Sequence, residues 1–476
     1  MASPENQIPP PAATPSHRIL HKFAYLLTAR WLRDALLGIF LILLARKSAA
    51  TYGEFMLALG LGAILLRVGE FGLNLPLVSL FSGKDRDAGL ALGRVLVLKG
   101  VLVAGALAGG LIFIQWQGYS PALKQVMLAI AGGVALEALA TTFFVACQVQ
   151  GRQDQESKIK ALGAGVGLGY GLITLLAGAA PLTIALFKLI ETLVILAAGA
   201  ILIIPRMPPR MPSFKGIWTL AQQGLIFALI EIAAIIYNKA NLFFLQSYGG
   251  AHSVAQYSVT QETVEGLSGM VSTLLLQSVI FPLFVKLWDV DKSQVSRLAQ
   301  NTARWLLTAS LPLMWVLFVE SDRIILLIYG AQYQDAVWVQ KYLVITVVSG
   351  YLHNLAALLM ISMRRERLLL LFYLSGLAVN LVACPLLIPA NPLLGATLAI
   401  IITKLTVACL TVSYCQRQVA LIPKGPLLHL ALAALAGLAA YFLTISYLPR
   451  ELPEALALAP ILALAWRWWR QGSGEK

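Results

Sequence analysis

Long stretches of this sequence carry almost no charge. Residues 161–180 contain no acidic or basic side chain, and residues 217–236 contain one, Glu231. Each stretch matches the ~20 apolar residues that a helix needs to cross the hydrocarbon core of a bilayer. Soluble domains carry about 25% charged residues, whereas this chain carries 12% and is 59% hydrophobic. The sequence therefore predicts a polytopic membrane protein and excludes a soluble enzyme.

Apolar runs between polar or Pro/Gly breaks predict an all-α fold with about fourteen membrane-spanning helices. They lie near residues 23–45, 55–79, 90–115, 122–148, 159–179, 181–204, 216–238, 253–284, 299–319, 336–361, 367–388, 393–415, 427–447 and 454–470. The segment before them, residues 1–22, is polar and proline-rich at its start, so we expect a disordered cytoplasmic tail.

Basic residues favour one side of the predicted membrane. Of the 36 lysines and arginines, 23 fall on the face that holds both termini and 7 on the opposite face. Cytoplasmic connections of membrane proteins are rich in Lys and Arg. Both termini are therefore expected in the cytoplasm, and the net charge of +14 needs no nucleic-acid partner to explain it.

A weak internal repeat divides the chain into halves. The connection after the first span contains Tyr52, and the one after the seventh contains Tyr257; Pro181 opens the sixth span and Pro392 the twelfth. Six helices per repeat predict two bundles related by a pseudo-twofold axis along the membrane normal, with a central cavity between them. The predicted parts are a bundle at 23–204, a cytoplasmic linker at 205–215, a bundle at 216–416, and two extra helices with a cytoplasmic tail at 417–476.

Motifs for nucleotide, metal or disulfide chemistry are missing from the sequence. There is no GxxxxGK[ST] run, the five histidines form no ligand cluster, and the four cysteines have no CxxC spacing. We expect no metal, no cofactor and no disulfide. The glycine-rich run at 163–171 lies inside an apolar span, where Gly163, Gly167 and Gly171 share one helix face, so it predicts close helix packing rather than a nucleotide loop.

Arginines are concentrated in the first two predicted spans. The first span contains Arg30, Arg33 and Asp34, and the second contains Arg67 and Glu70. A charge at the centre of a bilayer-spanning helix costs ~2.5–3.5 kcal/mol on insertion scales, and spacings of three and four allow within-helix ion pairs that reduce this cost. Even with both acids paired, one arginine remains. A guanidinium is suited to bidentate phosphate binding, so the three arginines are predicted to bind an anionic substrate, with Asp34 and Glu70 as charge partners.

Other charged residues inside the spans allow two explanations. Lys188 and Glu191 are expected to form a structural pair within one helix, and Lys99 and Lys404 to extend toward the headgroup layer. Glu262 and Glu265 share a helix face with no basic residue within one turn. Neighbouring acids favour binding of a proton or a cation, and a water-lined vestibule is an equally good explanation.

Several short motifs, taken together, resemble those of one transporter family. They are Leu43–Arg46, Thr51–Phe55, Phe71–Leu73, Ile328–Gly330 with Tyr333, and Val379–Asn380 ahead of Leu387–Pro389. Their order and spacing, over residues 23–416, are similar to those of the oligosaccharide and polysaccharide flippases of the MOP exporter superfamily. These O-antigen-type translocases are relatives of lipid II flippases and of MATE drug exporters. Arg33-Asp34-Ala35 also resembles a first-helix motif of the lipid II flippases.

The resemblance implies a function. Flippases of this family move a polyprenyl-diphosphate-linked glycan from the cytoplasmic to the outer leaflet of the bacterial inner membrane, for surface polysaccharides such as lipopolysaccharide. The implied fold is two six-helix bundles in a V, and the implied diphosphate ligands are Arg30, Arg33 and Arg67. Implied partners are the lipid-linked glycan, membrane lipids, and the polymerase or glycosyltransferases of the same pathway, with a proton or sodium gradient as the energy source.

One position departs from the family pattern. Many members end the seventh helix with an acidic residue, where this chain has Tyr237-Asn238-Lys239. Glu231, Glu262 and Glu265 are the remaining candidates for ion coupling, and Lys239 is a candidate second-half cation for the substrate. Two other functions stay open. A MATE-like cation-coupled antiporter needs central acids rather than arginines, and a membrane-embedded glycosyltransferase needs a larger loop than any here.

Overall fold

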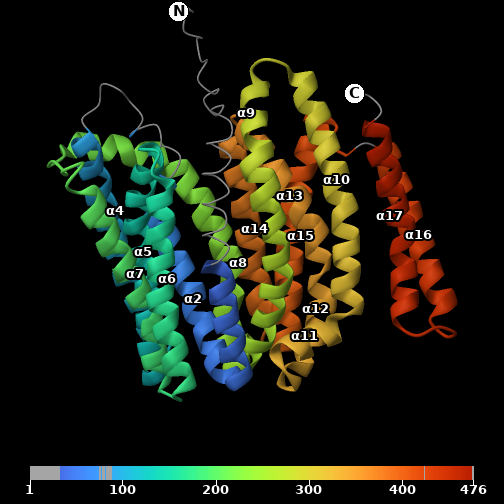
Figure 1. Ribbon diagram of the computed structural model, residues 1–476, viewed down its shortest axis with the longest axis horizontal. Coiled ribbons are helices and arrows are strands. Elements are labelled where there is room, and N and C mark those ends of the chain that lie inside the picture. Colours follow the sequence, from blue (N-terminus) through green and yellow to red (C-terminus); the bar gives the residue numbers. More distant parts are fainter. Residues whose placement is uncertain (1–32, 74–76, 78–80, 82–87, 423, 474–476) are drawn as a thin grey trace, which may run out of the picture. The chain divides into compact units, whose positions relative to one another are not determined.

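The computed structural model describes residues 33–73, 77, 81, 88–422 and 424–473. Helices joined by short turns make up this part of the chain, and no strand occurs in it (Figure 1). Eleven helices within the described ranges are long and apolar enough to cross a membrane. The prediction of an all-α polytopic membrane protein is confirmed.

The chain divides into two compact units. Of the described residues, one unit takes in those within 33–41 and 65–225, and the other those within 42–64 and 226–473. Helix α2 (Ala49–Glu70) and helix α8 (Phe214–Val271) each contribute residues to both. The predicted division at 205–215 remains a prediction about the repeat.

In the first unit, four helices follow one another and run alongside each other (Figure 1). They are α4 (Ala88–Trp116), α5 (Pro121–Val149), α6 (Gln153–Leu176) and α7 (Pro181–Ile203). Proline at the first position of α5 and α7 favours helix initiation, because its missing N–H would be unpaired there in any helix. The unit also includes a helix through residues 33–47 as far as residue 41.

The glycine face of α6 packs directly on α7. A Cβ on Gly167 would lie 2.5 Å from the Cβ of Glu191 and 2.8 Å from the carbonyl oxygen of Phe187. A Cβ on Gly163 would lie 2.3 Å from Ile195, and one on Gly171 would lie 2.9 Å from Phe187. The prediction that these glycines serve close helix packing is confirmed.

The second unit contains the remaining helices. They are α8 from residue 226, the π-helix η1 (Ser272–Ile280), α9 (Phe281–Trp288), α10 (Lys292–Val319), α11 (Ser321–Tyr329), η2 (Ala331–Tyr333), α12 (Gln334–Leu343), α13 (Ile345–Ser362), α14 (Glu366–Leu387), α15 (Pro392–Val419), α16 (Lys424–Thr444) and α17 (Glu451–Ser473). Helix α15 packs against α13 and α14, α13 against α10, and α16 pairs with α17 as a hairpin (Figure 1).

Several predicted boundaries were wrong. The seventh span was expected to end at 238, but α8 continues to Gly250, where φ is 71° and ψ is −179°. The segment 49–55 was expected to be a connection, but α2 already begins at Ala49. That helix ends at Glu70 instead of residue 79, because Phe71 and Gly72 both have positive φ. The short helix α11 was not predicted.

Two of the motifs behind the family resemblance, Leu43–Arg46 and Ile328–Gly330 with Tyr333, meet in the second unit. The Arg46 guanidinium donates to the carbonyl oxygens of Leu327 and Ile328, with 2.7 Å from its Nε to the latter. These are carbonyls at the C-terminal end of α11, where a cation is favourable. The Tyr333 hydroxyl donates to the Ala45 carbonyl oxygen at 3.1 Å. The shared motifs therefore hold the end of the first helix against α11 and η2.

Gly53 lies in the Thr51–Phe55 motif, and the structure explains why glycine stands there. A Cβ at Gly53 would lie 2.0 Å from the carbonyl oxygen of Ala251, directly after the break at Gly250. Any side chain at residue 53 would push α2 away from α8 at this point, so the Tyr-Gly-Glu motif has a packing explanation.

Candidate functional site

A ring of four charges lies inside the first unit. Arg33 Nε is 2.7 Å from Glu191 Oε1, and Arg33 Nη2 is 3.0 Å from Glu137 Oε1. Lys188 Nζ is 3.0 Å from Glu137 Oε2 and 3.1 Å from Glu191 Oε2. Each cation therefore contacts both carboxylates. We call Arg33, Glu137, Lys188 and Glu191 the four-charge cluster.

Close packing of three helices brings the cluster together. Lys188 and Glu191 are one turn apart on α7, so they share a face. A Cβ on Gly133 of α5 would lie 2.9 Å from the backbone of Lys188, which shows how closely α5 approaches α7 one turn before Glu137. The helix through residues 33–47 adds Arg33.

The cluster is largely withdrawn from solvent. The exposed fractions of its side chains are 19% for Arg33, 16% for Glu137, 7% for Lys188 and 3% for Glu191. Buried charges are tolerated only when they are paired and hydrogen-bonded. Both conditions hold here, and the more open side of the ring is formed by Arg33 and Glu137.

The predicted pairing of Lys188 with Glu191 within one helix is only part of what the structure shows. Lys188 and Glu191 do form the expected pair, but each has a second partner beyond its own helix. Glu137 was not predicted as a site residue, and its partners are 51 and 104 positions away along the chain. An acid inside an apolar span was the only signal in the sequence.

The other predicted first-half residues lie as follows. Arg67 and Glu70 form the expected within-helix pair, with 2.5 Å between Nη1 and Oε2, and the Arg67 side chain is 41% exposed. Asp34 is exposed. Arg30 lies outside the described residues.

Lys99 does not extend toward a headgroup layer, as had been expected. Its side chain is fully buried, and its ammonium donates to the Ala138 carbonyl oxygen at 3.0 Å and to the Thr141 hydroxyl at 2.9 Å. Since α4 and α5 pack together, the amine finds acceptors on the neighbouring helix instead of at the membrane surface.

In the second unit, each of the two predicted acids faces a lysine. Lys239 Nζ is 3.8 Å from Glu262 Oε1, and Lys404 Nζ contacts Glu265 Oε1. Lys404 was expected to extend outward, which is wrong. The acids lack a basic neighbour only within one helical turn, because Lys239 lies before the break at Gly250 and Lys404 lies on α15. Glu231 is half-buried on α8.

A polar cavity of about 220 Å³ lies beside the Glu265–Lys404 pair. The buried His353 ring at its edge has hydrogen-bond contacts with the Thr411 hydroxyl at 3.1 Å and the Tyr373 hydroxyl at 3.0 Å. The cavity is lined by Tyr237, Asn238, Val264, Glu265, Ser268, Gly269, Thr346, Ser349, Gly350, Tyr351, His353, Asn354, Lys404 and Val407.

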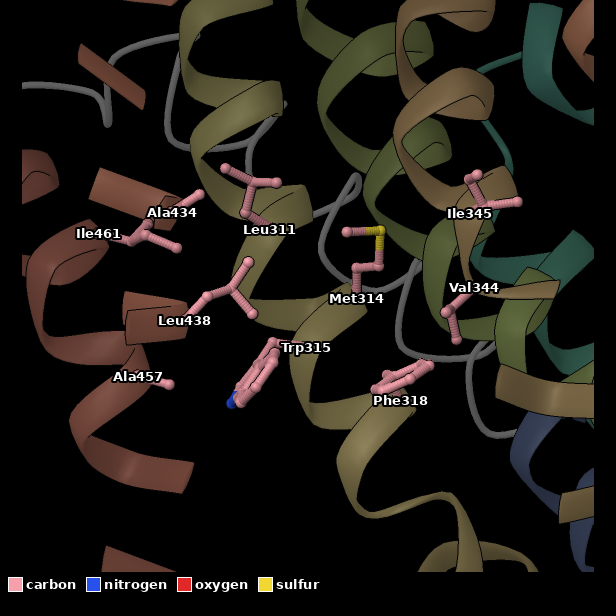
Figure 2. A pocket seen from close by; sticks show the side chains of 10 residues that line it. All are labelled: Leu311, Met314, Trp315, Phe318, Val344, Ile345, Ala434, Leu438, Ala457 and Ile461. Atoms are coloured by element: carbon pink, nitrogen blue, oxygen red, sulfur yellow. The ribbon is translucent and has the colours of Figure 1, made fainter. Parts of the chain in front are cut away.

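An apolar groove of about 310 Å³ lies between the α16–α17 hairpin and the rest of the second unit (Figure 2). Trp315 stands between the two sides, with its indole N–H donating to the Glu454 carbonyl oxygen at 3.1 Å. The lining residues are Leu311, Met314, Trp315, Phe318, Val344, Ile345, Ala434, Leu438, Ala457 and Ile461. Their chemistry fits a hydrocarbon chain.

Ion pairs at one end of this groove hold the hairpin. Arg450 contacts both Asp322 and Glu454 at 2.7 Å, and Arg323 contacts Glu451 at 2.8 Å. The hydrogen bonds from Arg450 lower the pKa of Asp322 below its ordinary value of 3.8. The connection between α16 and α17 is therefore tied to α11.

Comparison with known proteins gives a family and a fold. Residues 45–338 match the family described as polysaccharide biosynthesis protein. No curated protein matches the chain in sequence.

Solved structures of transporters share the fold. A lipid II flippase, MurJ, in an inward closed conformation is similar with a TM-score of 0.73 and 12% identity, over 94% of this chain and 99% of that one. An inward-facing MATE family multidrug transporter of the MOP superfamily has a TM-score of 0.61 and 11% identity, over 82% and 94%. A MOP superfamily transporter from Pyrococcus furiosus has a TM-score of 0.55 and 12% identity, over 85% and 95%.

Proposed function

This chain belongs to the polysaccharide biosynthesis protein family, and from that premise we propose that it is a flippase for a polyprenyl-diphosphate-linked oligosaccharide. It would carry the lipid from the cytoplasmic to the outer leaflet by alternating access, for cell-surface polysaccharide such as O-antigen. The proposed location is the bacterial inner membrane, with both termini in the cytoplasm. The enzymes that build and polymerise the glycan would act before and after it.

The observation that carries this proposal is the buried guanidinium of Arg33. It contacts two carboxylates at once, through Nε and Nη2. The same fork binds two oxygens of a phosphate in bidentate fashion. Lys188 beside it, and Arg67 in α2, are further cations of the same unit, each paired with carboxylates. A diphosphate moving through the spans needs such partners, because an unpaired charge is costly away from water.

The apolar groove supports the proposal for the other part of the substrate, its polyprenyl tail. A polyprenyl chain gains free energy by leaving water, at about 0.8 kcal/mol per buried CH₂ group. The groove offers a continuous hydrocarbon lining from α10, α16 and α17 (Figure 2). We propose that it holds part of the tail while the head group crosses.

The energy source is assigned to the second unit as part of the proposal. Glu262 and Glu265 would bind a proton or sodium ion when Lys239 and Lys404 move away from them. Glu231 is a third candidate. A bound proton or sodium ion neutralises the carboxylate and frees the lysine. Such binding can shift the equilibrium between two conformations if one of them keeps the lysine–carboxylate pair and the other does not.

The leaflet distribution of lipid-linked glycan tests the function. Deleting the gene should leave the glycan on the cytoplasmic leaflet of spheroplasts, and wild-type protein should restore export. Arg33→Ala should lower export at least about tenfold, because charge-assisted hydrogen bonds contribute ~1.5–3 kcal/mol each. Arg364→Ala, which removes an exposed arginine (79% exposed) elsewhere, should restore export fully.

The opposite result has a definite meaning. Full export by Arg33→Ala would exclude the phosphate role. An unchanged glycan distribution in the deletion strain, together with altered sensitivity to cationic drugs, would favour the antiporter function.

A further inference from the structure

The four-charge cluster carries no net charge. Arg33 and Lys188 supply two positive charges, and Glu137 and Glu191 supply two negative charges. Because each cation contacts both carboxylates, neither cation can turn to a ligand without leaving two acceptors behind. The donors of both cations are therefore already taken by carboxylates of the same cluster.

Among the described residues, charged groups also lie on the helices that pack around the ring, and Lys99 is a buried cation that contacts the residue directly after Glu137. On α4, Lys99 donates to Ala138 and Thr141. On α2, Arg67 is paired with Glu70, and Gly69 between them packs on Ala138. Helix α6 presents its glycine face to Glu191.

Asp34, next to Arg33, is exposed.

A diphosphate diester brings two negative charges. Added to the neutral ring, it would create a doubly negative site in an interior where charge is poorly solvated. Two protons on the carboxylates would remove that excess and free both cations for the phosphate oxygens. Charge balance in the cluster therefore couples binding of the diphosphate to binding of protons.

We propose that Glu137 and Glu191 are built-in counterions that release Arg33 and Lys188 to the substrate diphosphate only when they are protonated, so that substrate binding takes up protons. This inference rests on the proposed function. Each proton adds to a carboxylate oxygen and no covalent bond to the substrate forms. When the substrate leaves, the carboxylates lose their protons and recapture the cations. The loaded and empty forms then have the same charge within the spans.

Proton uptake on binding can be measured directly. The probe is farnesyl diphosphate esterified at its terminal phosphate with N-acetylglucosamine, whose two charges do not titrate near neutral pH. Calorimetry of purified protein in buffers with different ionisation enthalpies gives the number of protons bound per ligand. We expect uptake of up to two protons in the wild type, and a dissociation constant that rises about tenfold per pH unit for each proton.

Variants assign those protons to the ring. Glu137→Gln and Glu191→Gln should each lower the proton number by about half, and the double variant should bind without uptake and with an affinity independent of pH. Glu366→Gln, which removes a carboxylate at the start of α14, is the matched control and should keep the wild-type number.

A charge-balanced variant covers the case of poor folding. Lys188→Met combined with Glu191→Leu leaves one cation and one carboxylate, and should bind with about half the wild-type uptake. Binding without proton uptake in the wild type, or unchanged uptake in the double glutamine variant, would overturn the inference. Failure of the wild type to bind the probe would instead contradict the proposed function.

Discussion

Arg33 has a structural role in the four-charge cluster and, in the proposed function, a second role in binding substrate. Its guanidinium balances two buried carboxylates that would otherwise be uncompensated. The same donors are those that a phosphate would use. A residue in this position is sensitive to substitution for two reasons, which stability measurements can separate from export measurements.

Removing one member of the ring should destabilise the protein. Glu191→Leu leaves Arg33 and Lys188 with one buried carboxylate between them, and breaking a buried pair in this way costs about 3–5 kcal/mol. Thermal unfolding in detergent should show a large decrease in melting temperature. Lys188→Met added to Glu191→Leu should recover most of it, because the remaining charges balance. An equal loss in the single and double variants would contradict the coupling.

The Arg450–Asp322 pair predicts a response to acid. Because Arg450 lowers the pKa of Asp322, its contribution to stability is complete above the ordinary value of 3.8 and is lost as the pH falls through the lowered pKa. Amide protection factors in α16 and α17, which correct for the intrinsic pH dependence of hydrogen exchange, should therefore be high at neutral pH and fall in strong acid. Asp322→Asn should exchange faster already at neutral pH. Equal exchange in the two proteins at neutral pH would show that the pair does not hold the hairpin.

At the scale of elements, helix contacts depend on where glycine is placed. The same run in α6 contains glycines that face α7 and glycines that do not. A Cβ on Gly167 would collide with Glu191 and Phe187, whereas a Cβ on Gly165 would meet nothing within 4 Å. Alanine substitutions at Gly165 and Gly167 are therefore expected to have different effects on the stability of the protein.

Gly167→Ala should separate α6 from α7. Overpacking of this kind costs about 1–3 kcal/mol, and it should also disturb the cluster at Glu191. Gly165→Ala should be neutral or stabilise by up to ~1 kcal/mol, because alanine favours the helix. Melting temperatures of the two variants make the comparison, and equal effects would mean that α6 does not pack through this face.

Hydropathy predicted the helices well and their internal features poorly. The seventh span was predicted to end at residue 238, within the polar stretch that contains Asn238, Lys239 and Asn241. In the structure, Asn241 is fully buried and Lys239 faces Glu262, so these polar residues are turned toward protein. A hydropathy average cannot distinguish that environment from a loop.

The site was predictable only in part for a related reason. Arg33 was identifiable because a charge inside an apolar span is unusual. Its partner Glu137 was visible in the same way, but the pairing depends on how closely α5 and α7 approach at Gly133. That approach is a property of tertiary packing, which a single sequence does not contain.

At the scale of the whole molecule, the two extra helices add an apolar surface to the second unit. Their hairpin lines one side of the groove (Figure 2). Ion pairs of Arg450 with Asp322 and Glu454 hold the end of the hairpin. The two C-terminal helices, predicted as additions to the two bundles, therefore form one wall of the groove.

Filling the groove should impair export without unfolding the protein. Leu438→Trp places an indole among the lining residues and should lower glycan export about tenfold, equivalent to ~1.4 kcal/mol of tail binding. Leu435→Trp, at a neighbouring position that is 62% exposed and does not line the groove, is the matched control. Equal export by both variants would show that the groove does not bind the substrate tail during export.

Finally, the contact between Arg46 and α11 sets an order of events during synthesis. Arg46 leaves the ribosome 281 and 282 residues before the carbonyls that accept its hydrogen bonds. At roughly 5–20 residues per second, the guanidinium waits about 15–55 s for them. The helix through residues 33–47 and α2 must therefore be inserted before α11 is synthesised. Correct assembly then requires that the Arg46 guanidinium be kept from other partners during this interval.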